Sequence, residues 1–243
     1  MKKKIHYLLL TITSLFFYSC LISLGEFGNS DIDLNFKHIW ENETIHLQSE
    51  IPYKNDTLII NKLEYVLSDI KLISHTDTIL VINHQIIKAG NSFSSFNVSM
   101  NDVPNNLYKI VFTFGLKNTN FAYNDLYAQN FNTSNNGYYF LKLEGKEKLS
   151  NKNFSYHIAK DTNSSYINHF QVEINGFDVG NYYKNEAIIK MNVKNLFTNP
   201  NTINIEDLTS DVINKKVIHA KLLENTQNVF YLDRFVHSYS DYE

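Results

Sequence analysis

The sequence predicts an all-β protein, an antiparallel β-sandwich with one short helix near the C-terminus. Apolar and polar residues alternate in short runs, as in strands that bury every second side chain. Turn-forming residues separate these runs, and one segment alone has the apolar spacing of a helix. Hydrophobic residues make up 43% of the 243 residues, which is enough for one sizeable core.

The alternation recurs along the chain. In the first run, Leu34, Phe36 and His38 alternate with Asn35 and Lys37, so one face is expected to be buried. Further runs of this kind cover residues 96–101, 108–114, 141–144, 170–175 and 187–193. The segment 207–228 instead has helical spacing, and the dipeptide at 210–211 (Ser-Asp) is its expected N-terminal cap.

Asparagine is the expected turn residue of this chain. The sequence has 33 Asn but 8 Gly and 3 Pro. Asn tolerates the left-handed backbone region, and its amide bonds to nearby backbone groups. We therefore expect Asn to take turn positions at 105–106, 135–136 and 199–201.

Composition excludes several classes of function. A single cysteine rules out a disulfide scaffold and Cys-ligated zinc or iron–sulfur sites. The scarcity of glycine argues against a glycine-rich phosphate loop. With a net charge of −3, the chain has no excess of the basic residues that bind nucleic acid, so no nucleic-acid partner is expected.

The N-terminus has the features of an export signal. Three lysines at positions 2–4 precede an apolar stretch that is too short to span a bilayer well. The stretch ends at Cys20, the one cysteine, which follows Ser19 as in a bacterial lipoprotein cleavage site. We expect residues 1–19 to be a lipoprotein signal peptide and Cys20 to carry the lipid; the alternative is an ordinary signal peptide with an incidental cysteine.

Cleavage after residue 19 defines the mature protein. It removes three lysines and no acid, which changes the net charge from −3 to −6. We expect residues 20–32 to be the lipidated cysteine and a tether, and residues 33–243 to be a single domain. The protein would then be anchored to a membrane of the cell envelope, on the periplasmic side or at the cell surface.

The sequence contains no catalytic signature, and no enzyme is expected. The sequence lacks G-x-S-x-G, H-E-x-x-H and a cysteine nucleophile with partners. Histidines remain, and His38 and His157 stand out because each lies among aromatic residues in a strand-like run. A neutral, partly desolvated imidazole binds a soft or borderline metal. The alternative for each is a core histidine that is hydrogen-bonded to a backbone carbonyl.

Six segments carry a resemblance to a known family. They are LNFKHIW (34–40), INKLEYVLSDIKL (60–72), VPNNLYKIVFTFGLKNTN (103–120), GYYFLKLEG (137–145), SYHIAK (155–160) and ENTQNVFYLD (224–233). In this order they resemble the MbnP-like copper-binding family. The resemblance implies an exported, β-rich protein that binds copper, with His38 and His157 as metal ligands, and a di-haem MauG-like enzyme as partner.

One segment departs from the family pattern. Before G-Y-x-F the family commonly shows M-f-W-x-W, whereas residues 130–134 here read Asn-Phe-Asn-Thr-Ser. Trp40 is the single tryptophan of the chain. Two functions are therefore carried forward: a copper carrier or sensor that uses His38 and His157, and a metal-free surface module for protein or glycan contacts, with the many Tyr and Phe at its surface.

Overall fold

The computed structural model describes residues 32–75, 77–90, 94–98, 107–116, 126, 129–131, 138–160, 170–176, 183–208 and 216–239. The expected signal peptide, Cys20 and nearly all of the tether lie outside these residues. The first strand, β1, begins at Ile32. The strands are β1 (Ile32–Trp40), β2 (Glu43–Thr44), β3 (Glu50–Tyr53), β4 (Asp56–Ser74), β5 (Thr78–Lys88), β6 (Ser94–Val98), β7 (Leu107–Phe114), β8 (Tyr138–Glu147), β9 (Asn153–Lys160), β10 (Phe170–Asn175), β11 (Tyr183–Asn192) and β12 (Phe230–Tyr239).

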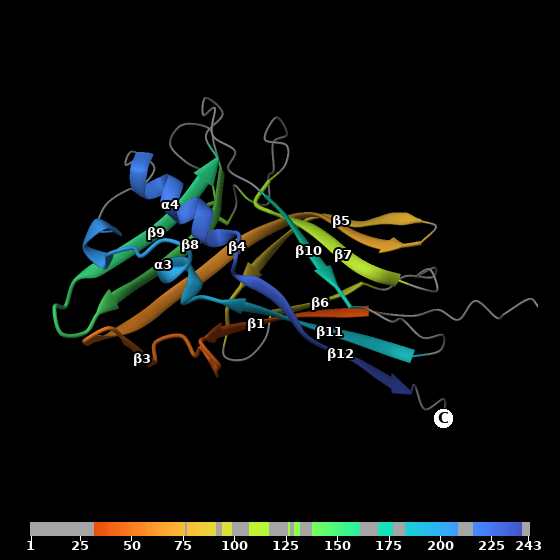
Figure 1. Ribbon diagram of the computed structural model, residues 1–243, viewed down its shortest axis with the longest axis horizontal. Helices are drawn as coiled ribbons and strands as arrows, with labels where there is room; N and C mark the ends of the chain where they lie inside the picture. The colour runs from red at the N-terminus through yellow and green to blue at the C-terminus, as the bar shows by residue number, and fades with distance from the viewer. Residues whose placement is uncertain are drawn as a thin grey trace, which may run out of the picture.

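The first sheet is centred on β1. Its order is β12-β11-β1-β2, and β6 also pairs with β1 (Figure 1). The strands β1 and β11 run parallel, whereas β1 pairs antiparallel with β2 and β6, and β11 with β12. The all-β prediction is confirmed, but one strand pair departs from the purely antiparallel arrangement that we expected.

The second sheet is organised by the long strand β4. Its order is β10-β7-β4-β8-β9, and β3 and β5 also pair with β4. All of these pairs are antiparallel. Because β4 has 19 residues, β8 pairs with its first half and β7 with its second half. Two distant parts of the chain are thereby held against one strand.

The core lies between the two sheets. The ring of Phe36 on β1 meets that of Phe112 on β7 edge to face, with centroids 6.0 Å apart. Phe230 on β12 contacts Phe112 in the same way, at 5.4 Å. The alternation predicted for β1 is confirmed, because Leu34, Phe36 and His38 are buried while Asn35 and Lys37 are partly exposed.

Many of the described aromatic side chains lie in this core. The fully buried ones among the described residues are Tyr65, Tyr156, Phe36, Phe112, Phe114, Phe131, Phe140 and Phe197. Trp40 is also buried and packs against Tyr53 and Phe197. The expectation of an aromatic surface suited to partner contacts is thus wrong for these residues, which are held by the hydrophobic effect and by edge-to-face ring contacts.

Two short helices and a 3-10 turn cover the end of the core at β8 and β9 (Figure 1). They are α3 (Asn195–Thr198), η1 (Ile205–Leu208) and α4 (Lys216–Thr226). The predicted helix over 207–228 is found in part, as α4, while its expected cap at 210–211 lies outside the described residues. The hydroxyl of Tyr156 on β9 contacts both helices, because it lies 3.2 Å from the carbonyl of Leu196 in α3 and 3.3 Å from that of Leu222 in α4.

Within the described ranges no helix has the length and apolar character needed to cross a bilayer.

Asparagine lies in several described turns, at positions 42, 55, 130 and 228, and residues 199–201 form a bend. Among the described non-glycine residues, a left-handed backbone occurs at Glu41, Gln48, Lys54, Asp69, Asn130 and Asn151. The expected turns at 105–106 and 135–136 lie outside the described residues. Asn199 precedes a cis proline and has an extended backbone.

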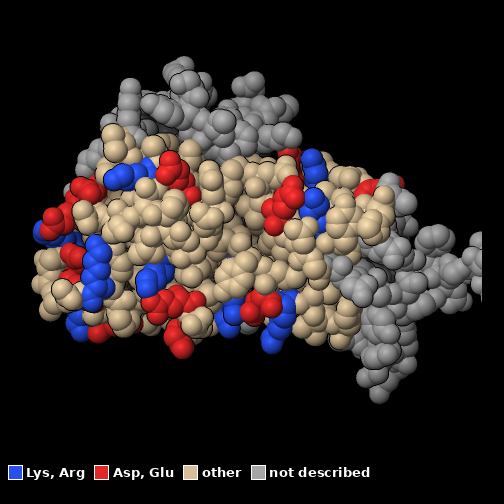
Figure 2. Space-filling model, viewed as in Figure 1, with Lys and Arg blue, Asp and Glu red and all other residues tan. Residues whose placement is uncertain are grey.

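Charged side chains of both signs are interspersed over the face in Figure 2. Several of them pair across strands, as Lys109 does with Glu173 at 2.9 Å and Lys190 with Asp233 at 2.6 Å. Pairs of this kind at the surface contribute little to stability.

Candidate functional site

His38 is a residue of the core. It points from β1 toward the second sheet and is 3% exposed. Its Nε2 lies 3.1 Å from the hydroxyl of Tyr65 on β4, within hydrogen-bonding distance, and the two rings meet edge to face. Burial lowers the pKa of His38 from 6.5 to about 4, because a charged imidazole loses its hydration there. His38 is therefore a neutral side chain that links the two sheets.

His157 lies in a different environment. Its side chain, on β9, is 22% exposed. Its Nε2 is 3.1 Å from Oε1 of Glu144 on β8 and 3.2 Å from the hydroxyl of Ser155. Burial lowers the pKa of His157, and the positive charges of Lys142 and Lys62 lower it further. The carboxylate of Glu144 acts in the opposite direction and raises this pKa. The imidazole is thus neutral near pH 7 although it faces a carboxylate.

Strand register places the two histidines on opposite faces of the second sheet. Residues paired across antiparallel strands project from the same face, and neighbours along a strand alternate. Tyr65, Leu141 and Ile158 form one row across β4, β8 and β9, and all three are buried in the core that His38 enters. The next row contains Lys142 and His157, so these project from the outer face.

The structure therefore does not bring His38 and His157 together. Two ligands of one ion, at bonds of about 2 Å, must lie within roughly 4 to 5 Å of each other on the same side of the backbone. Here the backbone of the sheet stands between them. Among the described residues no group of three His, Cys, Asp or Glu side chains is placed to hold a metal. The described donors do not fit the copper site that the resemblance implies.

Lysines occupy the surroundings of His157. Lys62 on β4 donates to Oε1 of Glu144 at 3.2 Å. Lys142, paired with His157 across β8 and β9, is 7% exposed and donates to the carbonyl of Asn130. The Lys142 ammonium lies 4.4 Å from the centre of the Phe131 ring.

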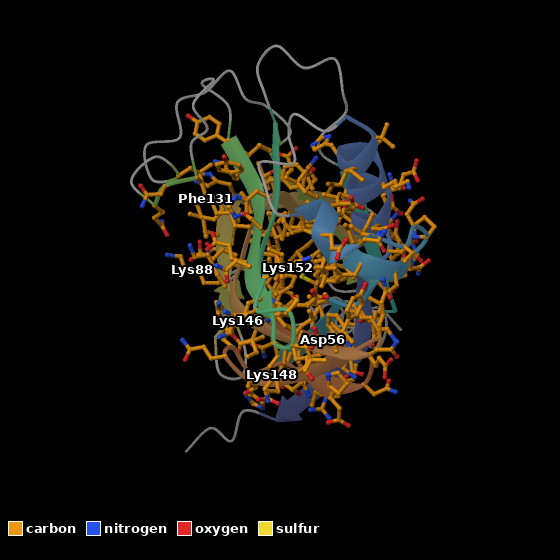
Figure 3. The ribbon with its side chains drawn as sticks, turned by 90° about the vertical axis from the view of Figure 1, so that its left-hand side faces the viewer. Asp56, Lys88, Phe131, Lys146, Lys148 and Lys152 are labelled. Carbon is orange, nitrogen blue, oxygen red and sulfur yellow. The ribbon has the colours of Figure 1, made fainter. Side chains whose placement is uncertain are left out.

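Burial of Lys142 has an identifiable cause. Phe131 is fully buried, and its carbonyl accepts a 2.6 Å hydrogen bond from the amide of Tyr139. This fixes the segment 129–131 against β8, and Figure 3 shows Phe131 and Lys88 on the side of β8 away from α4. The pKa of Lys142 is lowered by this burial. In this chain Asn130 and Phe131, the described residues of the segment 130–134, cover a lysine.

Ser155, His157 and Glu144 do not form a hydrolytic relay. In such an arrangement the carboxylate bonds to one ring nitrogen and orients the imidazole, while the other ring nitrogen takes the proton of the nucleophile. Here the carboxylate and the hydroxyl both approach Nε2. The arrangement fixes the imidazole instead of activating the serine.

A polar hollow lies beside this cluster. Its volume is roughly 350 Å³, at the low end of the range for small-molecule sites. It is lined by Asn61, Glu144, Gly145, Asn153, Phe154 and Ser155, from β4, β8 and β9. Figure 3 looks onto this end of the molecule, where the neighbouring Lys146 and Lys152 are labelled.

The sequence did not predict a role for Glu144, Lys142 or the hollow, although it contains one signal. Phe154, Tyr156 and Ile158 alternate with polar residues, which assigns His157 to the face opposite the buried one. His38 belongs to the buried set of its own strand. The same pattern that predicted the strands therefore separated the two histidines.

Comparison with known proteins gives the family of this chain. The family model described as MbnP matches residues 29–217. Among solved structures, MbnP from Methylosinus trichosporium is similar with a TM-score of 0.45 and 9% sequence identity, over 72% of this chain and 78% of that one. No curated protein matches this chain. Because the family model covers well over half of the sequence, the chain belongs to the MbnP family.

Proposed function

We propose that the protein is a non-enzymatic binding protein, lipid-anchored at Cys20 in the cell envelope, that does not hold copper between His38 and His157. One observation carries the proposal: the second sheet lies between the two imidazoles, since His38 enters the core from β1 of the first sheet and His157 projects outward from β9. His38 is engaged with Tyr65 in the core and neutral, so its role is structural.

The charges around His157 support this reading. The Lys62 ammonium bonds to Glu144, and Lys142 lowers the pKa of His157 through its own charge. A metal cation placed here would meet the same repulsion. Residues 130–134 also lack the tryptophans that a di-haem oxidising partner would modify, so the proposal includes no such partner.

The lipid anchor rests on the sequence. A basic segment, an apolar stretch and Ser19-Cys20 stand in the order that lipidation requires. Replacing Cys20 by Ser removes the thiol and should move the protein from the membrane to the soluble envelope fraction. A Cys20→Ser protein that stays in the membrane fraction would contradict anchoring at this residue.

Copper titration tests the proposal itself. The mature chain from residue 20, carrying Cys20→Ser to remove the thiol, is titrated with copper(I) against a chromogenic chelator. We expect that the protein does not take up one equivalent of copper(I) in a way that requires both His38 and His157. Uptake of one equivalent that is lost both in His38→Gln and in His157→Gln would overturn it.

A second candidate function is copper binding at His157 and Glu144 alone. The observation that favours it is the 3.1 Å separation of Nε2 and Oε1, which is close to the separation of two ligands on one ion. Imidazole and carboxylate together suit copper(II). If copper(II) binds here, His157→Gln should abolish its uptake and His38→Gln should leave the uptake unchanged. Lys142→Met should strengthen the binding of copper(II), because a repelling charge is removed.

A further inference from the structure

We propose that the hollow on the outer face of β4, β8 and β9 is a binding site for a neutral, hydroxyl-rich ligand, namely a saccharide. This inference rests on the proposed function and deepens it, because it names the ligand class of a protein that binds without the histidine pair. It is carried by the shape of the hollow, by its polar groups and by their charge balance.

The hollow is built on paired strands. Asn61 sits where the pairing of β4 with β8 shifts register, between Ile60 and Lys62, and its side chain is exposed. On β9, Asn153 pairs with Lys146 at the other side of the hollow. Three hydrogen-bonded strands therefore fix the lining residues, so a ligand would meet groups that are already in position.

The lining groups match the chemistry of a sugar. A saccharide hydroxyl both donates and accepts, and a side-chain amide offers both functions in one group. The hollow has two amides, on Asn61 and Asn153, together with the hydroxyl of Ser155 and the carboxylate of Glu144. Within the part of the chain that the structure describes, the side chains of Asn61 and Asn153 make no hydrogen bond.

Charge balance selects a neutral ligand. Oε1 of Glu144 already accepts from Lys62 at 3.2 Å and lies 3.1 Å from Nε2 of His157. Burial would raise the pKa of Glu144, but the hydrogen bonds from Lys62 and His157 and the positive charge of Lys62 outweigh this effect and lower that pKa. The carboxylate is thus ionised and paired, and its second oxygen remains a strong acceptor for a hydroxyl.

The floor of the hollow is mostly backbone. Gly145 has no side chain, and Phe154 is 3% exposed because its ring turns to Phe197 in the core, with centroids 5.9 Å apart. The ligand would therefore be held by hydrogen bonds rather than by ring stacking. Binding by a few hydrogen bonds is weak, and we expect a Kd in roughly the millimolar range.

Titration by NMR tests this site. The unlipidated mature chain is titrated with glucose, galactose, mannose and N-acetylglucosamine, each to about 10 mM, while backbone and Asn side-chain amides are observed. For at least one sugar, we expect the side-chain amides of Asn61 and Asn153 to shift. The double variant with Asn61→Ala and Asn153→Ala should weaken binding at least about tenfold. The control Asn83→Ala, at an exposed position on β5, should leave it unchanged.

Two results would overturn the site. One is that none of the four sugars moves the Asn61 and Asn153 amides. The other is that binding persists unchanged in a double variant that keeps the thermal unfolding midpoint of the parent. Neither result bears on copper, so a failure of this site and a failure of the proposed function are told apart by the copper titration.

Discussion

Glu144 and His157 belong to different sequence motifs, yet their side chains meet across β8 and β9, with Oε1 and Nε2 3.1 Å apart. Register pairs Glu144 with Ser155, so His157 is its diagonal neighbour on the outer face. The pKa of His157 is lowered by burial and by Lys142 and Lys62, and raised by Glu144. The protonation of His157 is therefore governed by residues that can be changed one at a time.

Substitutions beside His157 should move its pKa in opposite directions. Lys142→Met keeps the packing against Phe131 but removes a positive charge, so the pKa of His157 should rise. Glu144→Gln removes the carboxylate that favours the imidazolium, so the pKa should fall. NMR titration of the imidazole resonances measures both changes.

Lys146→Met is the matched control for the first of these substitutions. Lys146 lies on the same strand and pairs with Asn153 rather than with His157. Its replacement should move the pKa of His157 less than Lys142→Met does. Equal effects of the two lysines would show that overall charge, and not the neighbouring ammonium, governs His157.

Acid should destabilise the fold through His38. The pKa of His38 is about 4 in the folded protein, below the ordinary 6.5, so the unfolded chain binds the proton more readily. Stability is therefore complete above pH 6.5 and is lost as the pH falls from 6.5 toward 4. The gap between these values corresponds to a loss of about 3 kcal/mol.

Urea unfolding at pH 7 and at pH 4.5 measures this loss. His38→Gln cannot take up the proton, so the variant should lose less stability between the two pH values than the parent does. At pH 7 the variant should itself be less stable by about 1 to 3 kcal/mol, because the packing against Tyr65 is disturbed. The same acid loss in both proteins would show that His38 is not the group responsible.

Two glycines should respond differently to alanine. A Cβ on Gly145 would strike the carbonyl oxygen of Ile59 and would lie 2.6 Å from Cζ of Phe154. Gly145→Ala should therefore destabilise the protein by about 2 kcal/mol or more, since a neighbouring backbone has to move. At Gly90 no atom lies within 4 Å of an added Cβ, so Gly90→Ala should be neutral or slightly stabilising. The thermal unfolding midpoints of the two variants measure this difference in stability. Similar midpoints for Gly145→Ala and Gly90→Ala would argue against this packing at Gly145.

Local patterns predicted much of the fold because they report which side of a strand is buried. Leu34, Phe36 and His38 were assigned to one buried face, and the structure confirms it. Helical spacing placed a helix at 207–228, of which 216–226 is observed. Both patterns depend on residues that are close in the sequence, so they can be recognised without knowledge of the tertiary structure.

Contacts between distant segments could not be predicted in this way. The parallel pairing of β1 with β11 joins residues about 150 positions apart. The contact of Lys62 with Glu144 depends on the register of β4 against β8, and Lys142 is buried because the segment at Phe131 packs over it. Periodicity gives the face of a strand but not the strand that lies next to it, and the candidate site depends on the latter.

The imidazole NMR spectrum of His38 and His157, recorded during a copper(I) titration of the unlipidated mature chain, shows whether one ion binds both residues. We predict that one equivalent of copper leaves the His38 resonances and their contact with Tyr65 unchanged, because the sheet separates His38 from the outer face. Simultaneous shifts of both imidazoles, complete at one equivalent, would show that one ion binds them both. That result would contradict the separation of His38 and His157 by the sheet.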